Sequence, residues 1–301
     1  MSKKAAEWLL AGVIFARSTS LLFAKVGLES MSPLNLLAVR FCLAFAVLCV
    51  IFWKKLRTVT KTDLLHGMIL GGAFFAVMTC EVFGLTMTTA STVSFLANTA
   101  IVIVPLLEAV LHRKAPDRRA LLCAVVTLAG VGFLTLRNGL SGFGLGEGLC
   151  LLEACLYASA IILTAKFSHE GDAVLLGMFQ IGFLGLFAAI GSLLVETPHL
   201  PRSGTEWGVI LALALVCSCF GFTFQPVAQR YITADRAAQM CAINPLSTAV
   251  LSAVFLKERL GVQGVIGAAL ILLGIVMHNY HKSGAKVEAV VIETGKTTDA
   301  A

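Results

Sequence analysis

The sequence contains few charged residues. Aspartate, glutamate, lysine and arginine make up 13% of its 301 residues, whereas hydrophobic residues make up 58%. An ordinary soluble domain carries roughly 25% charged residues, so this composition argues against a pair of soluble domains. A mean hydropathy of +0.89 agrees with that conclusion. The composition therefore indicates a membrane protein.

The sequence also lacks the motifs of metal-binding and catalytic sites. Its nine cysteines lie inside or at the edges of apolar runs, with no Cys-x-x-Cys pair and no histidine at ligand spacing, a pattern that argues against a metal site or a disulfide framework. No Gly-rich phosphate loop, His-Glu-x-x-His motif or nucleophile elbow is present. We therefore expect no enzyme activity, no cofactor and no metal ion.

The basic residues do not form a nucleic-acid-binding pattern. The net charge is +6, but lysines and arginines lie in the short breaks between apolar runs. They are not interleaved with aromatic residues on one face, as a nucleic-acid surface requires. We expect a lipid bilayer as the surroundings of this chain and no nucleic acid as a partner.

The apolar runs have the length of membrane-spanning helices. A bilayer core is about 30 Å thick, so a helix rising about 1.5 Å per residue needs around 20 apolar residues to cross it. About ten such windows fit the sequence, which predicts an all-α integral membrane fold. The predicted spans are Glu7–Leu28, Pro33–Trp53, Asp63–Met87, Ala90–Leu111, Asp117–Leu136, Gly144–Phe167, Asp172–Val195, Thr205–Gln229, Asp235–Leu256 and Gly261–His278.

An internal repeat divides the chain into two halves. The stretch Thr89–Leu134 and the stretch Thr233–His278 share sparse identities and one layout, an apolar run, a short charged break and a second apolar run. Five spans per half is an odd number, so the second half must enter the membrane upside down, as in many secondary transporters. We predict two inverted five-helix repeats at 1–138 and 144–280, a glycine-rich outer loop between them, and a disordered cytoplasmic tail at 281–301.

The lysines and arginines predict the orientation. With the amino terminus inside, the inner segments hold sixteen of them and the outer segments five. Because positive residues in short loops remain on the cytoplasmic side, we expect a multi-pass protein of the cytoplasmic membrane with both termini in the cytoplasm.

Four ionisable side chains lie well inside the predicted spans, namely Arg17, Arg40, Glu81 and Glu153. Each costs on the order of 2.5 to 3.5 kcal/mol at mid-membrane, so we expect them to face the bundle interior, paired or in contact with water. Arg40 and Glu81 have matching depth, which fits either a structural salt bridge or a cavity wall. Arg17 either contacts a substrate or pairs with Glu153. Glu153 is also the candidate for carrying a coupling proton, because burial disfavours a charged carboxylate.

Uncharged polar residues inside the spans are weaker candidates. They are Asn98, Tyr157, Gln180, Gln225 and Asn244. Hydrogen bonding between helices is the more ordinary role for any one of them. Asn244 has a second signal, because Pro245 follows it and a proline inside a helix frees a backbone carbonyl. We predict a cavity lined by the first, third, fourth, sixth, eighth and ninth spans, with Arg17, Arg40, Glu81, Asn98, Glu153, Tyr157, Gln225 and Asn244 as binding residues.

Several segments resemble one family of membrane proteins. The segment Asn244–Leu260, which ends in Glu258-Arg259-Leu260, is followed by a small-residue segment at Gly267–Gly274. With Ser32-Pro33 and Phe95–Asn98, these segments are similar to the EamA-type branch of the drug/metabolite transporter superfamily. The resemblance covers about Trp8 to His278. The charged break at 113–117 departs from the glutamate turn that the family has there.

The resemblance implies a ten-helix carrier that moves small metabolites, often amino acids or related solutes and commonly outward, through a cavity between the two halves. A channel or a non-transporting membrane sensor on the same scaffold is the alternative, since a scaffold does not determine a substrate. Besides a metabolite substrate, the partners left open are a coupling proton and a second copy of the chain in a homodimer.

Overall fold

The computed structural model describes residues 1–111, 118–135, 144–232, 240, 243–257, 261–274 and 276–277. Over these ranges the chain forms helices and no strands. The predicted tail at 281–301 and most of the predicted outer loop, 138–143, lie outside the described residues. So does the turn at Glu258-Arg259-Leu260.

Seven helices in the described part of the chain are long and apolar enough to cross a membrane. They coincide with seven of the predicted spans and cover Lys4–Gly27, Pro33–Ile51, Lys61–Met87, Ala90–Leu111, Leu145–Glu170, Ala173–Val195 and Gly204–Gln229. Shorter helices at Leu121–Phe133, Ile243–Phe255 and Val262–Gly274 fall within the other three predicted spans. The all-helical membrane fold is confirmed, and the count of ten spans stays a prediction.

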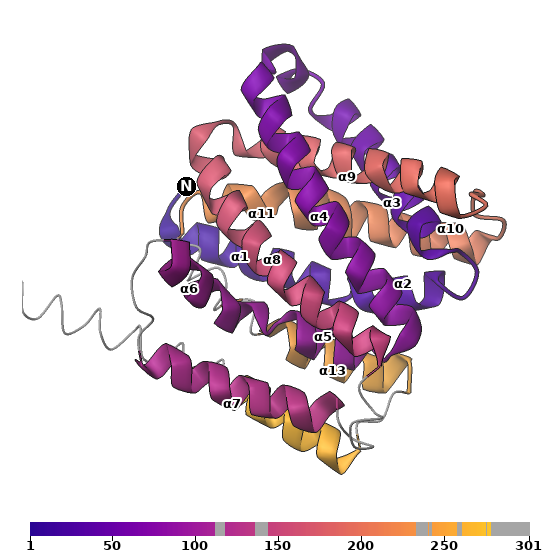
Figure 1. Ribbon diagram of the computed structural model, residues 1–301. Helices are drawn as coiled ribbons and strands as arrows, with labels where there is room; N and C mark the ends of the chain where they lie inside the picture. Colours follow the sequence, from indigo (N-terminus) through magenta and orange to yellow (C-terminus); the bar gives the residue numbers. More distant parts are fainter. Residues whose placement is uncertain are drawn as a thin grey trace, which may run out of the picture.

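The helices form one bundle with two helices along its edge (Figure 1). The helices of the first half are α1 (Lys3–Ser18), α2 (Ser20–Gly27), α3 (Pro33–Ile51), η1 (Lys55–Thr58), α4 (Lys61–Met87), α5 (Ala90–Ala97), α6 (Ala100–Leu111) and α7 (Arg118–Thr135). Those of the second half are α8 (Leu145–Glu170), α9 (Ala173–Val195), α10 (Gly204–Leu211), η2 (Ala212–Phe220), α11 (Gly221–Gln229) and α13 (Ile243–Phe255). The helix Val262–Gly274 lies against α7 at the edge, where Gly130 approaches the backbone of Ile271.

Local sequence signals start several of these helices. Thr60 and Asp63 form a capping box before α4, in which the Asp63 N–H donates to Thr60 Oγ1 and the Thr60 N–H donates to Asp63 Oδ2. Pro33 is the first residue of α3, a position where the missing N–H would have had no partner within the helix.

Three spans are interrupted in ways that hydropathy did not predict. The first span breaks at Thr19 between α1 and α2, where the Ser18 and Thr19 hydroxyls donate back to the carbonyls of Ile14 and Ala16. The fourth span breaks at 98–99 between α5 and α6. The eighth span contains the π-helical segment η2. Side-chain bonds to the backbone compete with regular helix, and π-helical turns are common at functional sites.

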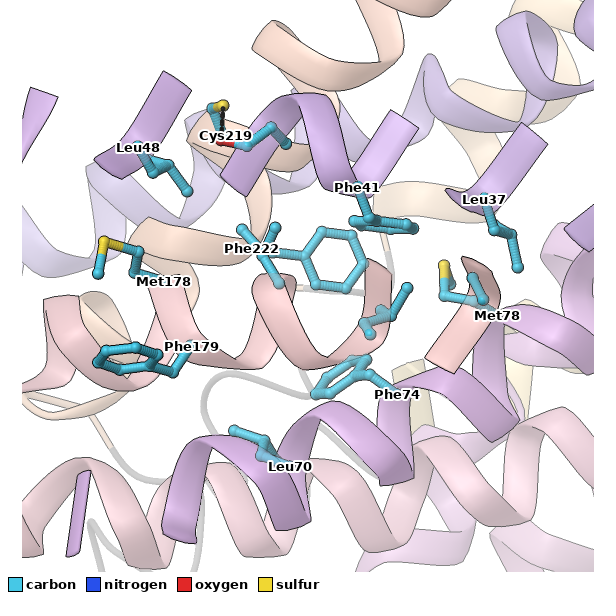
Figure 2. Close-up of a cluster of buried hydrophobic side chains, with 14 of the residues drawn as sticks. Leu37, Phe41, Leu48, Leu70, Phe74, Met78, Met178, Phe179, Cys219 and Phe222 are labelled. Atoms are coloured by element: carbon cyan, nitrogen blue, oxygen red, sulfur yellow. Dashed lines mark hydrogen bonds between the residues drawn. The ribbon is translucent and has the colours of Figure 1, made fainter. Parts of the chain in front are cut away.

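Aromatic packing holds α3, α4, α9 and α11 together (Figure 2). Phe222 of α11 makes edge-to-face contacts with Phe41 of α3 at 5.5 Å and with Phe74 of α4 at 5.4 Å between ring centroids. Because lipid tails are as apolar as these side chains, van der Waals packing rather than the hydrophobic effect provides this stabilisation.

Glycines allow α4 and α9 to approach closely. A methyl group added at Gly71 would lie 2.7 Å from Phe183 Cβ and 2.9 Å from the Gln180 carbonyl oxygen. At the next residue, Gly72, the nearest neighbour would be a ring atom of Phe187 at 3.6 Å. Gly71 therefore faces the helix contact, and Gly72 has room for a side chain.

This difference predicts opposite effects at adjacent residues. Gly71→Ala should destabilise the protein by about 1–3 kcal/mol, because the added methyl group meets backbone atoms of α9. Gly72→Ala should be neutral or stabilising, since alanine favours helix by roughly 1 kcal/mol over glycine. Thermal unfolding of the two purified variants in detergent measures the difference, and equal melting temperatures would contradict the packing.

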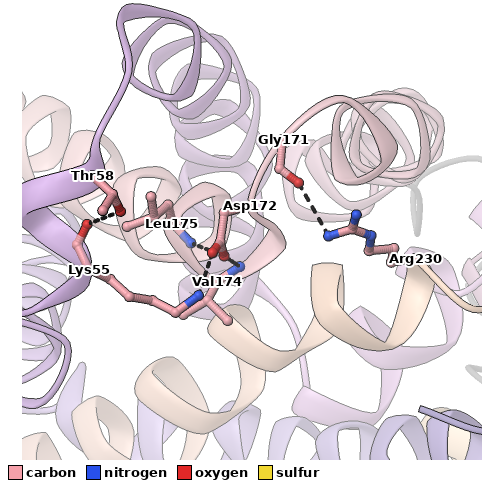
Figure 3. Close-up of polar contacts among 7 residues, drawn as sticks. All are labelled: Lys55, Thr58, Gly171, Asp172, Val174, Leu175 and Arg230. Carbon is pink, nitrogen blue, oxygen red and sulfur yellow. Dashed lines mark hydrogen bonds and ion pairs between the residues drawn. The ribbon is translucent and has the colours of Figure 1, made fainter.

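A polar link joins the two halves at one end of the bundle (Figure 3). Lys55, in the connection between α3 and α4, forms a salt bridge with Asp172, which precedes α9. Asp172 Oδ1 also accepts hydrogen bonds from the Val174 N–H at 2.8 Å and the Leu175 N–H at 3.3 Å. Burial raises the pKa of Asp172, but the hydrogen bond from Lys55, the two backbone hydrogen bonds and the charge of Lys55 together outweigh burial, and the pKa lies below its ordinary value of 3.8.

The lowered pKa predicts how the link responds to acid. A carboxylate with a depressed folded-state pKa stabilises the fold above its unfolded pKa, and this contribution disappears as the pH falls through the folded value. Asp172→Asn keeps a good helix cap and loses the charge. We expect its melting temperature to be below that of the native protein at pH 7 and the difference to narrow below pH 3.8. A pH-independent difference would show that the charge contributes nothing.

Candidate functional site

A small cavity lies between the two halves of the chain. Its volume is about 40 Å³, which is room for only a few water molecules because one water needs roughly 10–15 Å³ of such space. Seven of the eight predicted binding residues line it, namely Arg17, Glu81, Asn98, Glu153, Tyr157, Gln225 and Asn244. They come from α1, α4, α8, α11, α13 and the break between α5 and α6. These elements belong to the six spans predicted to line a cavity.

Arg17 is the central cation of this cavity. Its Nη1 donates to Gln225 Oε1 at 2.7 Å and to the Tyr157 hydroxyl at 3.1 Å. The guanidinium carbon also lies over the Phe222 ring, 4.6 Å from its centroid, and 5.3 Å from that of Tyr157. Gly221 permits this position, since an added methyl group would lie 3.1 Å from Arg17 Cγ. Contacts with α8 and α11 thus hold the charge inside the bundle.

Arg40 does not line the cavity as expected. It is 1% exposed, its Nε donates to Ser218 Oγ of η2 at 2.7 Å, and its guanidinium lies 4.7 Å from the centroid of its neighbour Phe41. In the described part of the chain, no salt bridge joins Arg40 to Glu81, although the two charges are close enough to interact. The salt-bridge alternative for Arg40 and Glu81 is therefore wrong, because the Arg40 side chain turns towards η2. The cavity-wall alternative is also not met for Arg40, which lies behind the residues that line the cavity.

Glu81 and Glu153 meet each other at the cavity. Both side chains line the same small cavity, and their carboxyl groups are near enough to each other and to Arg17 to interact electrostatically. Glu153 is 2% exposed, whereas Glu81 is half-buried. The sequence predicts either a pairing of Glu153 with Arg17 or a coupling proton on Glu153. A carboxyl partner was not foreseen, because depth in the membrane does not report which face of a helix a residue occupies.

Two asparagines line the cavity. Asn98 occupies the break after α5, and its Nδ2 donates to the Ser94 carbonyl at 2.7 Å. Asn244, in the first described turn of α13, accepts a 2.7 Å hydrogen bond from Ser18 Oγ. The cavity-lining Ser94 and the neighbouring Ser18 were not singled out from the sequence, because serine is common inside membrane helices and carries no specific signal.

Comparisons with known proteins agree with this architecture. Two segments, 4–136 and 144–280, match the EamA-like transporter family. An uncharacterized transporter of Archaeoglobus fulgidus is 28% identical over 258 residues, covering 84% of this chain and 79% of that protein. A second from the same organism is 26% identical over 280 residues, covering 89% and 95%. The uncharacterized transporter YcxC of Bacillus subtilis is 28% identical over 284 residues, covering 88% and 89%.

A solved crystal structure shares the fold. It has a TM-score of 0.67 at 18% identity and covers 92% of this chain and 98% of its own. At that identity the likeness supports the fold alone. The family match extends over most of the sequence, and the relatives are named as transporters. The chain therefore belongs to the EamA-like transporter family of the drug/metabolite transporter superfamily, and it is a multi-pass membrane transporter.

Proposed function

We propose that the protein is an alternating-access carrier that exports small polar metabolites, such as amino acids or related solutes, across the cytoplasmic membrane. The proposed sidedness, with both termini in the cytoplasm, rests on the sixteen basic residues of the inner segments against five outside. The outward direction rests on the resemblance to the family.

The observation that carries the proposal is Arg17 held in a buried polar cavity. Its guanidinium bonds Gln225 and Tyr157 on one side of a space that Glu81 and Glu153 also line. A solute with both an acidic and a basic group would find partners of each sign here. With Arg40 behind the wall, the four charges cancel when all are ionised, which suits a polar or zwitterionic solute better than a strongly charged one.

Contacts between the halves support two inverted repeats at 1–138 and 144–280. In the order of the ten predicted spans, the contact between α4 and α8 joins the third span to the sixth. The contact between α1 and α11 joins the first span to the eighth. Likewise, the contact between α5 and α8 joins the fourth span to the sixth, and the contact between α13 and α1 joins the ninth span to the first. Exchanging the two halves turns each contact into its counterpart, which is the pairing expected of two repeats related by a two-fold axis.

The narrow cavity and the broken helices favour a carrier over a channel. A volume of about 40 Å³ holds no metabolite, so a solute can enter only after helices separate. The breaks at Thr19 and at 98–99 lie next to Arg17 and Asn98. Discontinuous helices at a mid-membrane site are typical of carriers that rock one repeat against the other.

Counterflow in liposomes tests carrier against channel. Vesicles containing purified protein would be preloaded with a mixture of unlabelled amino acids and then offered each radiolabelled amino acid separately. A carrier should accumulate at least one label transiently, with saturable initial rates. Equilibration without saturation or counterflow would instead support the channel.

Arg17→Gln tests the binding residue. Hydrogen bonds to a charged group contribute about 1.5–3 kcal/mol each, so losing Arg17 should reduce counterflow at least ten-fold. Arg202→Gln is the matched control, because Arg202 is an exposed arginine before α10. If a folded, membrane-inserted Arg17→Gln variant has native flux, Arg17 is not part of the binding site.

A further inference from the structure

Glu81 and Glu153 place two carboxyl groups on the wall of one cavity of about 40 Å³. Ionised carboxylates only accept hydrogen bonds, so these two groups can bond to each other only when one of them carries a proton. Glu153 Oε2 is buried and receives no hydrogen bond from any donor in the described residues. The carboxyl group of Glu81 is the neighbour of the Glu153 carboxyl group at the cavity wall.

The charged and titratable groups around Glu81 and Glu153 favour the state in which these two residues together hold one proton. Arg17 approaches from α1 and Arg40 from α3, and these two cations favour at least one ionised carboxylate. Thiols of Cys80 and Cys150 and the Tyr157 hydroxyl lie nearby on α4 and α8. The other polar side chains named at the cavity are uncharged. They are Ser94 of α5, Asn98 of the break after α5, Gln225 of α11 and Asn244 of α13. Two negative charges this close together would repel each other strongly, because the dielectric constant of a buried site is low.

We propose that Glu81 and Glu153 form one proton-binding site, which shares a single proton at neutral pH and exchanges it with water through the cavity. As a site of proton coupling this inference rests on the proposed carrier function, but as a proton-binding site it stands alone. The proton changes the net charge of the two arginines and two glutamates from zero to +1. Protonation is thereby linked to the charge of a bound solute, and an acidic group on the solute binds more tightly while the proton is present.

Infrared difference spectroscopy of the purified full chain tests the pair without any solute. The native protein should show the signal of one protonated carboxyl group at neutral pH, and this signal should disappear at alkaline pH. Because the proton is shared, both Glu81→Gln and Glu153→Gln should lose the signal at neutral pH. Glu108→Gln is the matched control, since Glu108 is a half-buried glutamate of α6 outside the cavity, and it should keep the signal.

Two results would overturn the proposal. A signal that survives in Glu81→Gln would mean that Glu153 holds a proton by itself, and absence of the signal in the native protein would mean that neither does. Should one glutamine variant fail to fold, counting the protons released on the pH change decides instead. The native protein should release one more proton per chain than whichever of Glu81→Gln and Glu153→Gln does fold, and Glu108→Gln should release as many as the native protein. Failure of counterflow leaves this measurement unaffected, so the two proposals fail separately.

Discussion

The cost of charge in hydrocarbon is the constraint on which this structure depends. Four ionisable residues lie well inside the spans, and each needs a partner because no bulk water reaches the bilayer core. Arg17 is held by Gln225, Tyr157 and the face of Phe222, and Arg40 by Ser218. The glutamates line one cavity within reach of Arg17. These groups come from both halves of the chain, so their mutual stabilisation requires the halves to assemble around one cavity.

Close packing allows so polar a centre to remain narrow. Phe41, Phe74 and Phe222 form a continuous aromatic contact from α3 through α11 to α4, beside Arg17 and Arg40. Gly71 brings α4 within backbone distance of α9. This rigid part of the bundle contrasts with the breaks at Thr19 and at 98–99, where regular helical bonding is already interrupted beside the cavity. Helices that rearrange during transport would do so most easily at these breaks.

Much of this arrangement follows from the sequence because depth in the membrane can be counted along a helix. Hydropathy located the spans, and the cost of burial identified Arg17, Glu81 and Glu153 as residues of the bundle interior. Counting along a helix does not report its rotation or its neighbours. The Glu81–Glu153 contact and the Arg40–Ser218 bond therefore had to come from the structure. The π-helical segment η2 and the break after Thr19 also escaped prediction, because side-chain hydroxyls and local packing outweigh an apolar pattern that reads as regular helix.

We expect the solute to bind in the cavity around Arg17. A ligand that binds only the folded protein raises its melting temperature by mass action, so a thermal-shift screen of the purified chain against small metabolites detects such binding. A metabolite that stabilises the native protein should leave the melting temperature of Arg17→Gln unchanged. An equal shift in both proteins would locate the binding site elsewhere and contradict this expectation.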